Sequence, residues 1–352
     1  MSQRKVRIGF VGVGSMGQCA HLRNYASLPD CEVVAIAELR EKTAKRVAEK
    51  YRVPRVYRDY RDMLAYEDLD GIVASQPFWR HGVLLPELLK AGKPMFIEKP
   101  LASTLEAGEA IVRAAAESGT WVMVGYHKRS DPASRYAWDE IQKLKATGEL
   151  GRMTYIRITM PAGDWVAGGF WDLVNEGDEA GPLPGEPPPK DMDSESFRQY
   201  TWFVNYYIHQ VNLMRFFLGE PYEVVHADPT GVLLVARSRS GLPAIIEMSP
   251  YRTTVDWQES ILVAFERGYV TVALPAPMAM NRPGRVEIFK DPDPKQSPQT
   301  IVPQLPWIHA MRQQAMNFLA AIRGEQPPPC EAPEALEDLK VARQYLTLWK
   351  GV

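Results

Sequence analysis

The sequence predicts a two-domain protein: an α/β domain with a doubly wound parallel sheet, then an α+β domain with a large open, mainly antiparallel sheet. The first prediction rests on short apolar runs that alternate with helical patterns up to residue 125. The second rests on strand-like runs between residues 222 and 289 that follow one another without intervening helices. A length of 352 residues also exceeds what one compact core usually holds. We therefore expect domains at residues 1–125 and 126–352, with a closing helix over 333–350 that can pack back on the first domain.

In the first domain, buried β-type runs alternate with amphipathic runs. The predicted strands cover residues 6–11, 32–37, 71–75, 95–97 and 121–124. The predicted helices cover residues 19–27, 42–51, 82–91 and 105–118. Ligands of such sheets bind outside the carboxyl ends of the strands, so the residues that directly follow these strands are the first candidates for a binding site.

The second domain shows a different pattern. Its predicted helices cover residues 133–147, 200–218, 308–323 and 333–350. Its predicted strands cover residues 153–160, 232–237, 244–248, 260–266, 269–274 and 286–289. Residues 163–196 form a long proline-containing loop, which in a compact domain is typical of a functional or a disordered segment. The proline-rich stretch 275–306 is interpreted as surface loops.

Composition argues against several classes of protein. The net charge of −2 lacks the basic excess of a protein that binds nucleic acid or a membrane surface. The three cysteines form no metal-binding or CxxC pattern, which favours reduced thiols and no metal site. The N-terminus has no signal-peptide pattern, and no apolar run is long enough to span a bilayer. We expect a cytoplasmic protein.

A glycine motif follows the first predicted strand and opens the first helix. Gly12, Gly14 and Gly17 fit G-x-G-x-x-G, with Ser15 and Met16 inside the motif. In this context the first glycine permits the tight turn, the second lets the backbone approach a pyrophosphate, and the third lets the helix pack closely. The helix N-terminus offers amide donors to the phosphates. The motif predicts a Rossmann domain that binds a nicotinamide dinucleotide.

Glu38 ends the second predicted strand, where a carboxylate can accept hydrogen bonds from both ribose hydroxyls of NAD and repel a 2′-phosphate. Arg40 lies close by and can contact adenine or a 2′-phosphate. We expect NAD as the cofactor, with NADP as the alternative.

Two further segments follow predicted strands and carry a family resemblance. Gln76, Pro77 and His81 come after the third strand, and Glu98-Lys99-Pro100 comes after the fourth. With these residues the chain resembles the glucose–fructose oxidoreductase/inositol dehydrogenase (Gfo/Idh/MocA) family over nearly its whole length. The Glu-Lys-Pro tripeptide is the most specific element of this resemblance.

The resemblance implies roles for individual residues of the first domain. Lys99 would touch the nicotinamide ribose and the substrate hydroxyl, Glu98 would orient Lys99 or the cofactor, and Pro100 would be a cis proline. Gln76, Pro77 and His81 would belong to the cofactor site. A lysine ammonium beside a reacting carbinol stabilises alkoxide character, so this role for Lys99 makes chemical sense.

The family's Asp-x-x-x-His signature corresponds to Asn205 and His209, with Asn212 three residues further on. Spacings of four and three place these residues on one helical face. The resemblance makes His209 the general base in oxidation, with a hydrogen-bonded core histidine as the alternative. Asn205 departs from the pattern because asparagine can orient the ring but adds no negative charge. Asn212 is interpreted as structural.

Softer candidates for substrate contact lie elsewhere. Tyr126, His127 and Lys128 follow the fifth strand and would lie at the rim of a cleft, or simply in a solvated loop. Asp164 and Trp165 end the first strand of the second domain, near where relatives place substrate contacts. Aromatic residues that flank the long loop suit sugar C–H surfaces but are equally ordinary in a core.

Together these patterns predict an NAD(P)-dependent oxidoreductase that acts on a secondary alcohol or ketone of a sugar, glycoside or cyclitol. A dinucleotide-binding regulatory protein without turnover is an alternative that Asn205 favours. A lyase or hydrolase that oxidises its substrate transiently is another. The resemblance further implies a homodimer or homotetramer, and we expect a small sugar or polyol as the substrate.

Overall fold

The computed structural model describes residues 4–293, 295 and 297–350, and the chain divides into two compact units. The first unit contains the chain up to Tyr126 together with Gly168–Asp191 and Gln314–Leu339. The second contains His127–Ala167, Met192–Gln313 and the chain from Lys340 onward. The predicted boundary assigned everything after residue 125 to the second domain. The two later segments differ because tertiary contacts, rather than local sequence pattern, tie them to the first unit.

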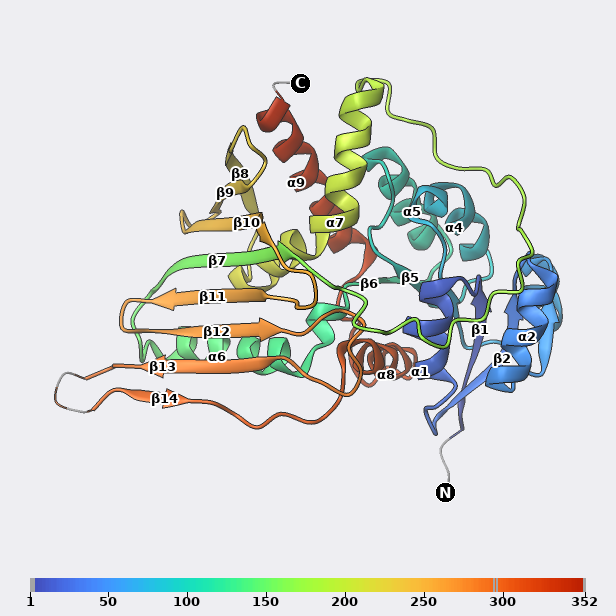
Figure 1. Ribbon diagram of the computed structural model, residues 1–352, viewed down its shortest axis with the longest axis horizontal. Coiled ribbons are helices and arrows are strands. Elements are labelled where there is room, and N and C mark those ends of the chain that lie inside the picture. Colours follow the sequence, from blue (N-terminus) through green and yellow to red (C-terminus); the bar gives the residue numbers. More distant parts are fainter. Residues whose placement is uncertain (1–3, 294, 296, 351–352) are drawn as a thin grey trace. The chain divides into compact units, whose positions relative to one another are not determined.

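The first unit is built on a parallel sheet with the strand order β3-β2-β1-β4-β5-β6 (Figure 1). Its strands are β1 (Val6–Val11), β2 (Cys31–Ala37), β3 (Arg55–Tyr57), β4 (Gly71–Ala74), β5 (Met95–Glu98) and β6 (Val122–Gly125). Neighbouring strands pair in parallel throughout. The order reverses between β1 and β4, which is the switch point where doubly wound sheets bind ligands. The predicted Rossmann topology is confirmed.

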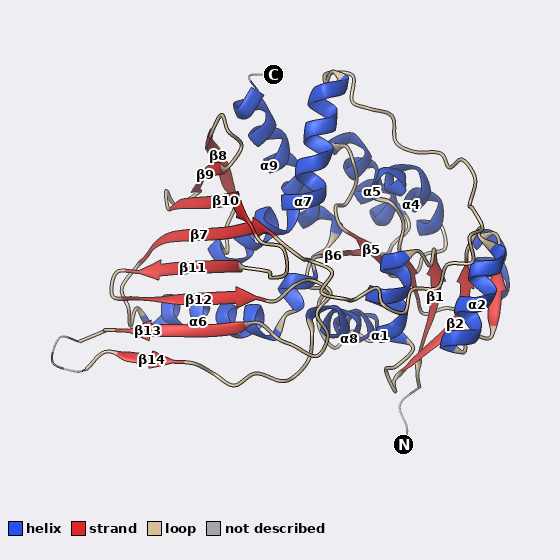
Figure 2. Cartoon of the chain, in the orientation of Figure 1, coloured by secondary structure: helices blue, strands red, loops and turns tan. Residues whose placement is uncertain are grey.

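Helices connect these strands (Figure 2). They are η1 (Gly17–Leu22, a π-helical segment), α1 (Arg23–Tyr25), α2 (Glu41–Tyr51), α3 (Tyr60–Tyr66), η2 (Phe78–Arg80), α4 (His81–Leu89) and α5 (Leu105–Glu117). The sequence pattern missed β3 and α3, which are too short for a clear periodicity. The side chain of Asp59 caps α3 by accepting a hydrogen bond from the Arg61 amide at 2.9 Å.

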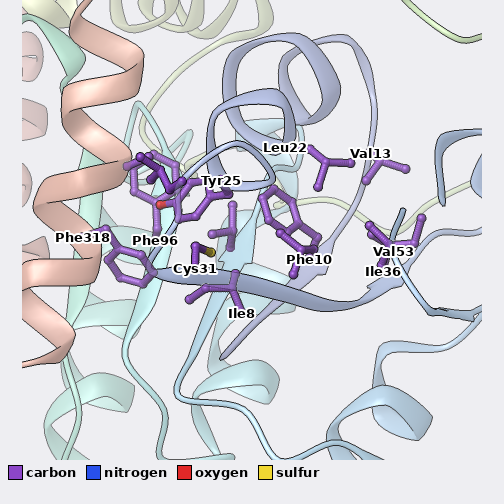
Figure 3. Close-up of a cluster of buried hydrophobic side chains, with 14 of the residues drawn as sticks. Ile8, Phe10, Val13, Leu22, Tyr25, Cys31, Ile36, Val53, Phe96 and Phe318 are labelled. Carbon is purple, nitrogen blue, oxygen red and sulfur yellow. The ribbon is translucent and has the colours of Figure 1, made fainter. Parts of the chain in front are cut away.

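A helix from late in the chain completes the core of this unit. Phe318 of α8 (Ala310–Ile322) lies beside Phe96 and Tyr25 in the close-up of Figure 3. Its ring makes edge-to-face contacts with Phe96 and Tyr25, at centroid distances of 6.0 Å and 6.4 Å. Tyr25 in turn contacts Phe10 of β1 at 5.5 Å. The apolar face of α8 therefore belongs to the first unit.

The second unit is built on a sheet with the order β14-β13-β12-β11-β7-β10-β9-β8. Its strands are β7 (Met153–Ala162), β8 (Tyr222–Ala227), β9 (Leu233–Ser238), β10 (Pro243–Arg252), β11 (Glu259–Phe265), β12 (Gly268–Leu274), β13 (Arg285–Lys290) and β14 (Gln299–Ile301). β7 and β10 pair in parallel, whereas the other neighbours are antiparallel. The predicted large, mainly antiparallel sheet is confirmed. The proline-rich stretch is not only loops, because β13 and the short edge strand β14 lie within it.

The remaining helices are η3 (His127–Ser130), α6 (Pro132–Thr147), α7 (Ser194–Leu218) and α9 (Ala332–Lys350). α7 begins at Ser194 rather than at the predicted residue 200, because the Asp193 side chain caps it by accepting from the Ser196 amide at 2.7 Å. On β11 every second residue is buried, and the first of these inward positions is a glutamate, Glu259. A charged residue on the buried face of a sheet needs a partner, which points to the polar cluster described below.

Candidate functional site

A cavity of about 520 Å³ lies at the carboxyl ends of β1, β2 and β4 in the first unit. This volume is in the range of cavities that hold cofactors. The predicted cofactor residues that line it are Gly12, Gly14, Glu38, Arg40, Gln76 and Pro77. Its lining, as far as the structure describes it, does not include Ser15, Met16, Gly17, His81, Glu98 or Lys99.

The three glycines of the motif do different things. A Cβ on Gly12, whose φ is +91°, would lie 2.5 Å from the Ser75 carbonyl oxygen, and a Cβ on Gly17 would lie 2.8 Å from the Gly12 oxygen. The chain itself therefore requires glycine at these two positions. A Cβ on Gly14 would meet nothing within 4 Å. Gly14 faces open space, which fits a loop that a dinucleotide pyrophosphate approaches closely.

Gln76 and Arg80 tie the end of β1 to the turn after β4. The Gln76 amide nitrogen donates to the Val11 carbonyl at 2.9 Å, and the Gln76 oxygen accepts from the Arg80 guanidinium at 2.6 Å. The wall of the cavity is thus fixed before any ligand binds.

Glu38 is a buried carboxylate whose hydrogen bonds are already made. It accepts from the Val13 amide at 2.9 Å, and from the Arg40 amide and guanidinium at 3.1 Å and 2.9 Å. Burial alone would raise the pKa of Glu38, but the hydrogen bonds from Arg40 and Val13 hold it below its usual value. The group is therefore ionised and fixed at the cavity edge, where a ribose would lie.

Further arginines line the same cavity, namely Arg58, Arg61 and Arg80. Arg61 lies over the ring of Tyr60 at 4.9 Å and pairs with Asp59 at 3.0 Å. The sequence pattern missed Arg58 and Arg61 because they follow β3 and begin α3, the two elements that were not predicted.

Glu98, at the end of β5, pairs with a histidine that the sequence pattern did not single out. Its side chain lies 2.6 Å from His21 Nε2 and accepts from the Lys99 amide at 3.2 Å. Although burial would raise the pKa of Glu98, the contacts with His21 and Lys99 lower it. Lys99 is half-buried, and the Lys99–Pro100 bond is cis, as the resemblance implied.

His81 supports the turn that carries Lys99. It is fully buried, and its Nδ1 lies 3.2 Å and 3.1 Å from the Pro100 and Leu101 carbonyl oxygens, to which it donates. Burial lowers the pKa of His81, so its ring is neutral at physiological pH. These contacts place it behind the turn rather than on the cavity surface.

A long segment, Gly168–Asp191, closes one side of the cavity; we call it the strap. Figure 1 shows it as the yellow-green trace that passes α1 and α2. Asp178 accepts from the Lys42 amide at 2.7 Å at the start of α2, and Glu186 accepts from the Gly82 amide at 2.7 Å at the start of α4. Between these two anchors, Ala180, Leu183 and Pro184 complete the cavity wall. The predicted long loop is thus an ordered part of the dinucleotide site.

The second unit contains a buried polar cluster around Glu259. Its carboxylate accepts from Lys128 Nζ at 2.5 Å, from Gln210 at 2.6 Å and from the Trp257 indole at 3.1 Å. The side chains of Lys128 and Glu259 are 4% and 0% exposed, so water contributes little to this pair. Burial lowers the pKa of Lys128, whereas the adjacent carboxylate acts in the opposite direction. Lys128 lies in the sheet interior rather than in a solvated loop.

His209 lies on α7 near this cluster's helix position Gln210. Its ring is buried and packs edge-to-face against the His127 ring at 4.6 Å. Asn205, one turn earlier, is exposed, and Asn212 is buried. The helix thus presents an imidazole at the inner end of a stripe that opens to solvent at Asn205.

The other predicted substrate residues are placed less suggestively. Asp164 closes a local turn by accepting from the Val166 and Ala167 amides at 3.0 Å each, and Trp165 is 38% exposed. Tyr126 is buried and belongs to the first unit.

The class of protein follows from the parallel sheet, the glycine loop and the carboxylate at the end of β2, which together define a dinucleotide-binding Rossmann domain joined to an α+β unit. Residues 6–126 match the family model described as "Oxidoreductase family, NAD-binding Rossmann fold", GFO_IDH_MocA. The chain belongs to this oxidoreductase family, as the motifs predicted.

Among known relatives, an uncharacterized oxidoreductase of Bacillus subtilis is 24% identical over 81% of this chain and 72% of its own length. An inositol 2-dehydrogenase of Acidothermus cellulolyticus is 34% identical over 38% of this chain and 39% of that protein. The latter match therefore spans well under two thirds of the relative. A solved structure of a putative NADPH-dependent oxidoreductase from Desulfitobacterium hafniense shares the fold, with a TM-score of 0.75, 14% identity and coverage of 98% and 96% of the two chains.

Within the described ranges, no helix has the length and apolarity needed to cross a membrane. The same residues contain no group of three or more His, Cys, Asp or Glu side chains arranged to hold a metal ion.

Proposed function

We propose that this chain is an NAD-dependent dehydrogenase that interconverts a secondary alcohol and a ketone on a sugar, glycoside or cyclitol. The observation that carries the proposal is the cavity at the switch point of the Rossmann sheet, with the ionised Glu38 at its edge. Relatives named inositol 2-dehydrogenase and scyllo-inositol 2-dehydrogenase (NAD(+)) support the substrate class.

Glu38 supports NAD over NADP because its fixed carboxylate suits ribose hydroxyls and repels a 2′-phosphate. Arg40 is engaged by Glu38 through its backbone and its side chain, which leaves it poorly placed to receive a phosphate. Gly12, Gly14 and Gln76 would hold the rest of the dinucleotide. When bound, that cofactor supplies the hydride acceptor in oxidation and the donor in reduction.

Lys99 and His209 are assigned the work on the substrate oxygen. Lys99 would donate a hydrogen bond to that oxygen and stabilise its negative charge, with Glu98 fixing the backbone beside it. His209 would accept the hydroxyl proton in oxidation and return it in reduction, with Asn205 as its orienting neighbour. Because asparagine brings no charge, His209 would be a weaker base than one beside a carboxylate.

The test of the proposal is NADH formation at 340 nm with a panel of sugars, glycosides and inositols. We expect turnover with at least one member and its loss in Lys99→Met, with NADH affinity within several-fold of wild type. The matched control is Lys93→Met, which changes a half-buried lysine at the opposite end of β5 and should leave the rate unchanged. Full activity in Lys99→Met would overturn the role of Lys99.

The same assay separates the alternatives. Tight NADH binding without turnover on any member would support a regulatory dinucleotide-binding protein, which Asn205 favours. Product without net NADH would support a lyase or hydrolase that oxidises its substrate transiently.

Removal of the proposed base should lower kcat by about 10²-fold or more in His209→Ala, the usual scale for a general acid–base group. NADH titration should be unaffected, because His209 lies in the other unit. His226→Ala, at an exposed histidine on β8, is the control. A wild-type rate in His209→Ala at every pH would reject the proton-transfer role.

A further inference from the structure

An exposed aromatic pair lies on the first half of α7. Trp202 is 52% exposed, and its ring stacks on Tyr206 with a centroid distance of 5.9 Å and an interplanar angle of 10°. A large aromatic face held open to water at this size is unusual unless something covers it.

The pair is rigidly supported from below. Tyr207 is fully buried, and its ring packs edge-to-face against Trp202 at 5.5 Å and against Tyr206 at 5.0 Å. The Tyr207 hydroxyl bonds the Ser249 hydroxyl of β10, which anchors this support to the sheet. A platform that is ordered in advance loses little entropy when a ligand binds it.

The pair continues the helix face that carries His209. Trp202, Tyr206 and His209 are spaced by four and three residues, so they lie along one stripe of α7. Seven residues of helix separate Trp202 from His209 by about 10 Å. A ring on Trp202 would therefore lie about one sugar unit away from a ring at His209.

The surroundings of the pair are polar, as a carbohydrate site requires. Burial raises the pKa of Tyr206, while the charge of Arg252, at the exposed end of β10, acts on the hydroxyl in the opposite sense. Aromatic faces that pack against sugar C–H groups, with hydroxyl and guanidinium donors at their edge, suit a pyranose better than a purely apolar partner.

We propose that Trp202 and Tyr206 form a subsite for a second sugar ring, so that the preferred substrate is a glycoside of at least two rings. This inference rests on the proposed function only in assigning the reacting ring to His209. It narrows the substrate class from any sugar or cyclitol to a disaccharide-like glycoside.

The test compares methyl β-glucoside, cellobiose and maltose by calorimetric titration of the NADH complex and by kcat/KM with NAD. For wild type we expect a disaccharide to bind about tenfold tighter than the methyl glucoside, a gain on the scale of one aromatic contact. Trp202→Ala should remove that preference while leaving the methyl glucoside unchanged, and Trp202→Phe should retain most of it. The control Trp307→Ala, at a tryptophan that is 84% exposed, should behave as wild type.

Each outcome decides one of the two proposals. Equal affinities in wild type, no binding of any probe, or a preference that survives Trp202→Ala would overturn the subsite. Turnover of the methyl glucoside without a disaccharide preference would leave the dehydrogenase proposal intact. A disaccharide preference that depends on Trp202, without NADH formation, would support the subsite and count against the dehydrogenase.

Discussion

The two units hold their polar side chains in opposite ways. In the first unit, Glu38, Asp178 and Glu186 each accept hydrogen bonds from backbone amides at turns and helix starts. In the second, Glu259 is held by three side chains, Lys128, Gln210 and Trp257, within the interior of a sheet. The comparison shows that a site made by backbone tolerates changes to single side chains, whereas a site made by buried side chains depends on every member.

The largest effect expected from this comparison is on the stability of the second unit. Lys128→Met leaves the Glu259 carboxylate buried beside no cation, which should lower the free energy of unfolding by about 3–5 kcal/mol. Urea unfolding followed by fluorescence measures it. Lys143→Met, which removes a surface partner of Glu140 at 3.7 Å, is the control and should cost less than about 1 kcal/mol.

The double variant Lys128→Met/Glu259→Leu should recover part of the loss, because an apolar pair of similar volume needs no compensation. If Lys128→Met alone cost no more than the surface control, the contrast between the two units would not hold.

A second buried carboxylate of the same unit gives the comparison a pH dependence. Asp131 caps α6, and burial raises its pKa to about 6 although it accepts from the Ala133 and Gly284 amides. A folded pKa above the unfolded value means that this stability is fully present below about pH 4 and is lost as the pH rises through 6. Two pKa units correspond to about 3 kcal/mol at most.

Asp131→Asn should flatten the stability profile between pH 4 and 6, since one amide oxygen can accept both hydrogen bonds that Oδ1 now accepts. Thermal unfolding at intervals of pH checks this. Asp193→Asn at the exposed cap of α7 is the opposite control, because hydrogen bonds from the Ser196 backbone and side chain lower the pKa of Asp193, so its stability is lost on acidification. A profile for Asp131→Asn that parallels wild type would contradict the assignment.

The same contrast explains how much the sequence could predict. Gly12, Gly14 and Glu38 were predictable because a turn, a helix start and a strand end lie within a short stretch of chain. The Lys128–Glu259 pair joins residues 131 positions apart, and no local pattern relates them. Nor could the pattern show that Val174, far along the chain, exchanges hydrogen bonds with Gln18 at 3.0 Å each way and so draws the strap onto the first unit.

The smallest predicted effect concerns the first unit and the choice of cofactor. Glu38→Gln keeps the shape of the side chain but removes its charge, which weakens hydrogen bonds to ribose hydroxyls and frees the Arg40 guanidinium. NADH affinity should fall about tenfold, or about 1.4 kcal/mol, while NADPH affinity should be unchanged or rise. Fluorescence titration with both dinucleotides measures the ratio, and Glu41→Gln, at an exposed position on α2, is the control. Because the Val13 amide can still bond a glutamine oxygen, the fold of the glycine loop should survive, and only the preference should move. Equal losses for both dinucleotides would mean that Glu38 shapes the loop rather than selects the cofactor, and the backbone-made site would then depend on its side chains as the buried cluster does.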